Sequence, residues 1–256
     1  MKITSKIILL LALSFSISLL GQKNEDPGSS SEPDEIDTSK PTNFYSFLDN
    51  TLEYSSQENQ NVFGYRGKVT LALSEAHMVL AEVPLLYNDR TKSFGLSDIR
   101  ARYFWLPYKN YEKLLGAFGP SLDIFAPTGD FKKGLGSGRW IISPGFTVGI
   151  MAADWIQFFP ILSYQYASKP IYDNPSPTAN KETHGLSFQV LVPIIITDKF
   201  FIQVTPILKM NNFNDERNDR YEQELFANYA LTSNMQLTAF YSGKFEDKNH
   251  TVSGGL

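Results

Sequence analysis

The sequence of 256 residues contains no cysteine and only three histidines. The absence of cysteine excludes disulfide bonds, thiolate metal sites, cysteine nucleophiles and lipid attachment through a cysteine. The three histidines, His77, His184 and His250, are widely spaced. Basic clusters are missing as well, because 23 basic residues are dispersed among 27 acidic ones, giving a net charge of -4. Without a basic stripe to neutralise phosphates, nucleic acid is not an expected partner, and no metal or cofactor is predicted.

Long apolar runs are confined to the amino terminus. Lys2 and Lys6 precede a mostly apolar stretch over residues 7–20 that contains three serines. This pattern predicts a secretory signal peptide over residues 1–21, since the run is too short and too polar for a helical membrane span. Residues 22–42 are rich in Ser, Pro, Asp and Glu. They cannot bury enough apolar area to offset chain entropy, so we expect a disordered acidic linker before a folded domain over residues 43–256.

Aromatic residues are abundant, with 19 Phe, 13 Tyr and 3 Trp making 14% of the chain. They fall in segments that alternate with a period of two, which places successive side chains on opposite faces of a β-strand. In RWIISPGFTVGIM, Trp140, Phe146 and Ile150 share one face, whereas Ser143 and Thr147 share the other. One face is therefore apolar and the other small and polar.

The alternating segments are longer than ordinary strands, at 11 to 14 residues, and this length is typical of tilted strands that cross a membrane. Short turns alternate with longer polar loops, as in outer-membrane barrels. The pattern predicts an all-β fold, an antiparallel transmembrane β-barrel of about twelve strands with both ends of the chain in the periplasm. The expected strands cover residues 43–54, 64–73, 76–87, 95–107, 113–125, 139–151, 155–168, 183–196, 199–211, 219–231 and 234–245, with a closing strand from Asn249.

Charged residues gather on the face opposite the apolar one. The strand parity places twelve candidates along the lumen: Arg66, Lys68, Glu82, Asp98, Arg100, Arg102, Asp123, Arg139, Lys209, Glu222, Glu224 and Lys244. So many charges would be prohibitive in the core of a soluble protein, but they can line a wet lumen. Two interpretations stay open: an ion-pair network that holds a narrow barrel shut, or a constriction that selects solutes by charge.

A glycine-rich stretch, GLGSG at residues 134–138, resembles loops that hold nucleotide phosphates. Such motifs require a helix immediately after the glycines, and a Walker motif requires the lysine after them. Here a clear β-strand follows, and Lys132 and Lys133 come before the glycines. We therefore interpret the stretch as an external loop whose glycines adopt positive φ angles.

Enzymatic function is not expected. Membrane-barrel lipases and deacylases place His and Ser two residues apart on one strand face, and no His-x-Ser occurs here. His184 and Ser187 are three apart and point to opposite faces. The acidic loop at residues 214–219 lacks the central glycine and distal glutamate of a calcium loop.

Three stretches resemble a known family. GLSDIRARYFW, FGPSLDIFAPTGD and GLGSGRWIISPGF, in this order, are similar to the outer-membrane barrel family named for the MetA-pathway of phenol degradation. The resemblance covers roughly residues 94–166, and it implies a transporter-like barrel without enzymatic activity. The positions that carry it are Asp98 and the external-loop residues Pro127, Thr128, Gly129, Asp130, Gly134, Gly136, Ser137 and Gly138.

The sequence thus favours a passive channel or transporter in the outer membrane for small solutes, aromatic or otherwise apolar. A closed structural or surface-interaction barrel is the second hypothesis, and a soluble lipocalin-like carrier is the third. The expected partners are outer-membrane lipids, the barrel-insertion machinery and a small-molecule solute; the sequence leaves the oligomeric state open.

Overall fold

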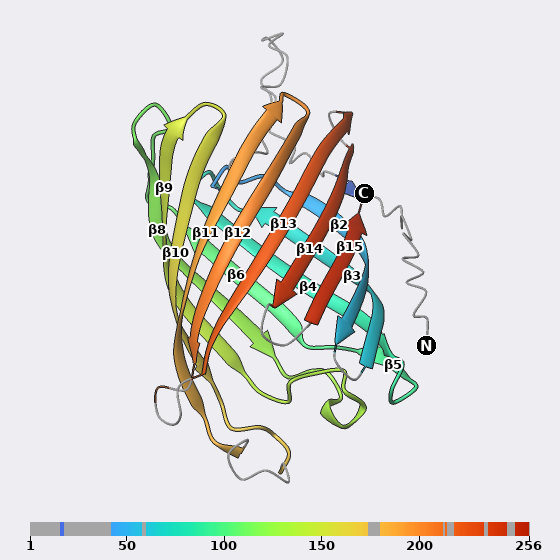
Figure 1. Cartoon of the computed structure of the whole chain (residues 1–256). Helices are drawn as coiled ribbons and strands as arrows, with labels where there is room; N and C mark the ends of the chain where they lie inside the picture. Colours follow the sequence, from blue (N-terminus) through green and yellow to red (C-terminus); the bar gives the residue numbers. More distant parts are fainter. Residues whose placement is uncertain are drawn as a thin grey trace, which may run out of the picture.

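The computed structural model describes residues 16–17, 42–57, 60–173, 180–211, 213, 218–232, 235–244 and 249–255. Most of these residues belong to one antiparallel sheet that closes on itself into a barrel, shown in Figure 1. The predicted signal peptide and acidic linker lie outside the described residues, apart from Ser16–Ile17 and Thr42. The expected loop at residues 214–219 is described only from residue 218 onward.

Each strand pairs with its neighbour in sequence, and the last pairs with the first. His250 lies opposite Ser56 and Gly255 opposite Thr51, so β15 closes the barrel against β2. Among the described residues, twelve strand positions complete the circuit. The long strands are β2 (Phe47–Gln57), β3 (Gln60–Ala72), β4 (His77–Asn88), β8 (Leu115–Ala126), β9 (Ile141–Ala153), β10 (Ile156–Ala167), β11 (Thr183–Thr197), β12 (Phe200–Asn211), β13 (Asn218–Thr232), β14 (Met235–Lys244) and β15 (Asn249–Gly255).

The remaining position between β4 and β8 is one strand broken into three pieces. These are β5 (Ser93–Leu96), β6 (Ile99–Trp105) and β7 (Tyr108–Lys109). β5 pairs with β4, β6 with both neighbours, and β7 with β8. The breaks fall at residues 97–98 and 106–107, where Pro107 cannot donate to the ladder.

The predicted all-β barrel of about twelve antiparallel strands is confirmed, and most strand bounds agree within a few residues. The first strand is the main correction. It was expected over residues 43–54, but β2 begins at Phe47 and continues to Gln57. Residues 42–46 are not part of the sheet, because Thr42 and Phe44 are buried inside the barrel instead of alternating across its wall.

The two ends of the barrel differ in their connections. At one end, the turn end, short connections join β3 to β4, β9 to β10 and β11 to β12. At the other, the loop end, longer connections include residues 127–140 and 168–182. The chain enters β2 and leaves β15 at the turn end, which lies at the top of Figure 1.

The outer wall is apolar in the way that the alternation predicts. The most exposed large hydrophobic side chains of the strands point outward, among them Phe63, Phe146, Phe188, Tyr221 and Leu225. Their neighbours in sequence point into the lumen, as the pleat requires. The structure therefore inverts the arrangement of a soluble β-barrel, whose apolar side chains face inward.

A short additional strand, β1 (Ser16–Ile17), pairs with β14 at Met235 and Gln236 and with β2 at Leu48. None of the helices among the described residues has the length and apolar character needed to cross a membrane.

Candidate functional site: the lumen

The lumen wall at mid-height carries a chain of alternating acidic and basic side chains across five neighbouring strands. We call it the arginine chain, and it comprises Glu53, Arg66, Glu82, Arg100, Asp123 and Arg102. Arg66 Nε lies 2.9 Å from Glu53 Oε2, and its Nη1 lies 3.1 Å from Glu82 Oε2. The second oxygen of Glu82 accepts from Arg100 Nη1 at 3.2 Å. Arg66 and Arg100 thus each link carboxylates on different strands.

Asp123 ends the chain by holding two arginines. Arg100 donates to it through two nitrogens, with Nε at 2.9 Å from Oδ1 and Nη2 at 2.6 Å from Oδ2. Arg102 donates to Oδ2 through Nε at 3.0 Å and through Nη2. Paired geometry of this kind is the stronger form of an arginine–carboxylate bond. Three guanidinium groups and three carboxylates therefore balance in charge while each keeps its hydrogen-bond partners.

A second charged group lies on the opposite part of the wall. Lys209 Nζ is 2.9 Å from Glu222 Oε2, and Lys244 Nζ is 3.9 Å from Oε1 of the same carboxylate. Glu224 follows on β13, and Arg100, Arg102 and Lys209 act on its carboxylate electrostatically. No ion pair within 4.0 Å of Glu224 occurs in the described part of the chain.

The candidate residues from the sequence thus divide into four sets. Arg66, Glu82, Arg100, Arg102 and Asp123 form the arginine chain. Lys209, Glu222, Glu224 and Lys244 gather on β12 to β14, and Lys68 pairs with Asp49 of β2. Asp98 and Arg139 lie elsewhere, at the loop end.

Asp98 sits at the break between β5 and β6 and holds the glycine-rich loop. Its carboxylate accepts from the main-chain N–H of Gly129 at 3.1 Å and from that of Ser137 at 2.6 Å. Thr128 adds two hydrogen bonds to the same break, because its hydroxyl donates to Ser97 O and accepts from Ile99 N. Pro127 connects this segment to β8. The strand is broken here because the loop takes its backbone partners.

The rest of the loop is a short helical turn braced on β4. Asp130 caps η1 (Phe131–Lys133) by accepting from Lys132 N, and Gly134 ends the turn at φ 67°. Asn88 Nδ2 donates to Gly134 O at 3.2 Å. A Cβ on Gly136 would lie 2.4 Å from the Asp98 carboxylate, and Gly138 has φ 66°. The predicted positive φ angles occur at Gly134 and Gly138, whereas Gly136 allows close packing against Asp98. Arg139 leaves this loop and donates to Lys181 O at 3.1 Å.

The three histidines lie apart, each beside a tyrosine. His77 Nδ1 is 2.6 Å from Tyr103 Oη, and His250 Nδ1 is 2.9 Å from Tyr241 Oη. His184 makes the equivalent bond with Tyr164. Within the described residues no cluster of metal-binding side chains occurs. None of these pairs resembles a catalytic arrangement of nucleophile and base.

Between the arginine chain and the turn end, the lumen contains a cavity of about 380 Å³. Its wall combines aromatic side chains with aliphatic and polar ones, and Phe159 on this wall is fully buried. Polar residues on the wall include Lys68 and Arg102, which reach it from the charged part of the lumen. The aromatic residues around the cavity are Phe44, Tyr45, Phe47, Phe104, Phe159, Phe201, Phe226 and Phe240.

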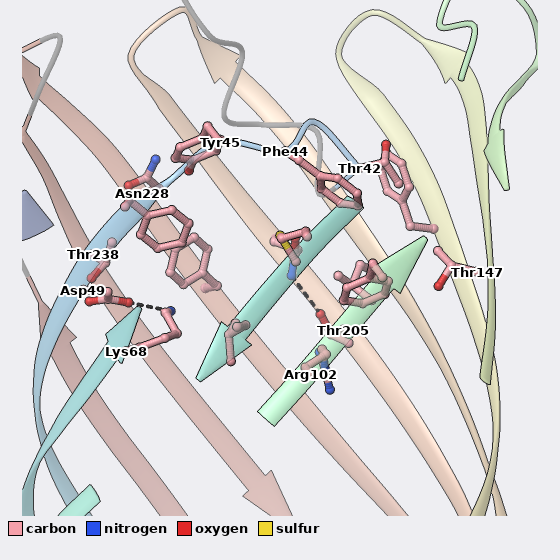
Figure 2. A pocket seen from close by; sticks show the side chains of 18 of the residues that line it. Thr42, Phe44, Tyr45, Asp49, Lys68, Arg102, Thr147, Thr205, Asn228 and Thr238 are labelled. Atoms are coloured by element: carbon pink, nitrogen blue, oxygen red, sulfur yellow. Dashed lines mark hydrogen bonds and ion pairs between the residues drawn. The ribbon is translucent and has the colours of Figure 1, made fainter. Parts of the chain in front are cut away.

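Residues 42–46, which we call the strap, close the cavity at the turn end. Thr42 and Phe44 are only 3% and 9% exposed. Thr42 Oγ1 lies 3.0 Å from Tyr111 Oη, and the Phe44 ring lies 6.3 Å from the Phe104 ring. Lys109 Nζ stands 5.1 Å from the centre of the Phe44 ring. Figure 2 shows Thr42, Phe44 and Tyr45 along one margin of the cavity.

Sequence reasoning missed three features of this site. Asp49 and Glu53 were not among the candidates because the expected first strand alternates poorly, although both residues lie within it and share a parity within β2. The phenylalanines that face the lumen occupy strand positions on the face predicted to be polar. Only this parity indicated that their side chains point inward. The strap gave no periodic signal at all.

Comparison with known proteins bears on the fold. No family model and no curated protein matches the chain. The solved structure of the NanC porin matches with a TM-score of 0.62 at 11% identity, covering 81% of this chain and 97% of that one. An outer membrane channel from Pseudomonas putida F1 matches with a TM-score of 0.57 at 12% identity, covering 88% and 98%. The KdgM porin matches at 0.55 and 7%, covering 81% and 97%.

These likenesses show the fold. The chain is a closed antiparallel transmembrane β-barrel of twelve strands.

Proposed function

We propose that this chain is a passive channel of the outer membrane for small solutes that are aromatic or otherwise apolar. One observation carries the proposal most directly: large apolar side chains cover the outer wall while paired charges line the inside. A wall of this kind is stable only when lipid surrounds it. We place the turn end in the periplasm and the loop end outside the cell.

The side chains that line the lumen support an aromatic or otherwise apolar solute. The arginine chain at mid-height lies next to the cavity of about 380 Å³, whose wall carries eight aromatic residues. Pockets of this volume accept small organic molecules, and aromatic walls favour planar apolar ones. The matched structures carry the names of porins and of an outer membrane channel, in agreement with this proposal.

A closed barrel without transport is the second candidate. It is favoured by the arginine chain, which ties five neighbouring strands together, and by the strap buried in the mouth of the lumen. In this alternative the lumen is structural, and the external loops bind a partner.

Conductance in planar lipid bilayers distinguishes the two candidates. We would refold the wild type, Phe44→Ala and a control, Phe94→Ala, whose side chain is 68% exposed at the loop end. A channel would conduct in the wild type, and Phe44→Ala would raise the conductance because it removes the strap's aromatic anchor. The control would leave it unchanged.

No conductance and no solute flux into vesicles in any of these variants would favour the closed barrel. Extraction tests the location separately. A membrane barrel requires detergent for extraction and shows heat-modifiable mobility in gels, whereas a lipocalin-like carrier would remain soluble without detergent.

A further inference from the structure

We infer that the cavity at the turn end is a binding site for a neutral aromatic molecule that carries one N–H or O–H donor. This inference rests on the proposed function only in that such a molecule would reach the site through the lumen. Three features of the cavity support it: the aromatic side chains of its wall, two polar atoms without partners, and the balance of charge around them.

The aromatic part of the ligand follows from the wall. Phe104, Phe159, Phe201, Phe226 and Phe240 come from five different strands and surround one space. On β13 and β14, Phe226 and Phe240 are direct cross-strand partners. Aromatic rings prefer offset or edge-to-face contacts with other rings, and a cage of several rings offers such contacts on every side. The volume of about 380 Å³ limits the ligand to one or two fused rings.

The donor follows from Asn228 and Thr147. Asn228 is 2% exposed, and its Oδ1 has no hydrogen-bond partner in the described structure. Thr147 is 3% exposed, and its Oγ1 also lacks one. Both residues line the cavity, and Figure 2 shows them on different sides of it. A buried carbonyl oxygen without a partner is costly, and it can only accept a hydrogen bond. A ligand that satisfies Asn228 must therefore donate.

The neutral charge follows from the charged groups on the wall. Lys68 is paired with Asp49, and Arg102 is held by Asp123. The Glu224 carboxylate also lines the cavity, but Arg100, Arg102 and Lys209 act on it from nearby. The site therefore offers acceptors without a net charge that would attract an ion. A carboxylate group would lose its hydration without gaining a free cation, and an ammonium group would meet only Glu224, on which three basic side chains already act.

Calorimetric titration of the full chain, folded in detergent, tests the inference. The compounds are indole, which donates through its N–H, and 1-methylindole, which cannot donate. We expect saturable binding of indole at the cavity and binding of 1-methylindole that is weaker by about tenfold, the equivalent of one net hydrogen bond. Tryptamine and indole-3-acetate test charge, and both should bind more weakly than indole.

The variant Asn228→Leu replaces the amide with an apolar group of similar size. It should still bind both indoles but lose the preference for indole. Thr147→Val, on the other side of the cavity, should likewise lose the preference for indole. It replaces Asn228→Leu as the test if that variant fails to show the heat-modifiable mobility of a folded barrel. Ser163→Ala on β10, which is not part of the cavity wall, should keep the preference.

Three results would overturn the inference: no saturable binding of indole, equal binding of both indoles by the wild type, or tighter binding of either charged compound. An unchanged preference in both folded variants would also overturn it. The proposed channel is tested independently. Conductance without saturable binding would contradict the binding site but not the channel. Saturable binding without conductance would contradict the channel but not the binding site.

Discussion

The two halves of the lumen are built in opposite ways. The half toward the loop end is held by ion pairs that run from strand to strand, and its outer rim is braced by the loop on Asp98. The half toward the turn end has an aromatic wall around a cavity and is closed by the strap. Charge pairs fix neighbouring strands in register, whereas aromatic side chains leave usable space between them. The difference indicates that rigidity and binding occupy separate heights of the same barrel.

The largest expected effect comes from removing an aromatic side chain of the half toward the turn end. Phe159 is fully buried, so Phe159→Ala should lower the free energy of unfolding by about 3–5 kcal/mol. Urea unfolding in lipid vesicles measures the change. Phe188→Ala, where the side chain is 41% exposed on the outer wall, is the control and should cost less. Equal losses would mean that the cavity wall contributes no more packing than the lipid-facing surface.

The second prediction addresses the charged half. Asp123→Asn removes the carboxylate that two arginines share, so it should cost about 1–3 kcal/mol of unfolding free energy. It should also shift ion selectivity toward anions, because Arg102 then lacks its counter-ion and Arg100 keeps only Glu82. The reversal potential across a salt gradient measures this shift. Asp154→Asn, in the exposed turn after β9, is the control. Unchanged selectivity would mean that the arginine chain does not line the conducting path.

The third prediction concerns the loop at residues 127–138, at the loop end of the barrel. Gly134 has φ 67°, and a Cβ there would lie 2.5 Å from Asn88 Nδ2. Gly134→Ala should therefore cost about 1–2 kcal/mol and loosen the loop. Protease cleavage within residues 127–138 measures the loosening. Gly67→Ala, where the nearest neighbour of the new Cβ is Tyr65 Oη at 3.4 Å, should be tolerated. A loop that stays resistant in Gly134→Ala would show that Asp98 alone holds it.

The smallest effect is expected from pH. Asn61 donates its main-chain N–H and its side-chain amide to Asp89, both at 2.7 Å, which lowers the pKa of Asp89. A lowered pKa stabilises the fold above the ordinary value of about 4, and this contribution is lost as pH falls through the folded value. The thermal midpoint of the wild type should thus fall slightly more than that of Asp89→Asn between pH 5 and pH 3. The same loss in both proteins would assign the effect to other carboxylates.

Much of the barrel could be predicted because strand parity is a local property. The alternation around Phe146 or Leu225 requires only neighbouring residues, and so do the turns that separate the strands. The parity also placed Arg100, Arg102 and Asp123 on one face. Their pairing could be expected but not specified, since the register between strands depends on strand tilt around the whole circuit.

The rest required the folded chain. Asp98 has the parity of a lumen residue, yet a loop thirty residues later recruits it. The cavity depends on five phenylalanines that converge from different strands, and no segment carries that information alone. The strap is a single short stretch without a period, and it lies inside only because Tyr111 and Phe104 offer it partners there.

The strap is joined to the first barrel strand but shares almost none of the ladder. Its contacts with the wall include a hydroxyl pair, ring contacts of Phe44 and Tyr45, and the bond from Ala72 N to Ser46 Oγ. Displacing it would therefore leave every pair of β2 with β3 and β15 intact. A segment held mainly by side-chain contacts opens at a lower free energy than paired strands do. Opening the mouth of the barrel at the turn end would thus require no strand of the wall to separate.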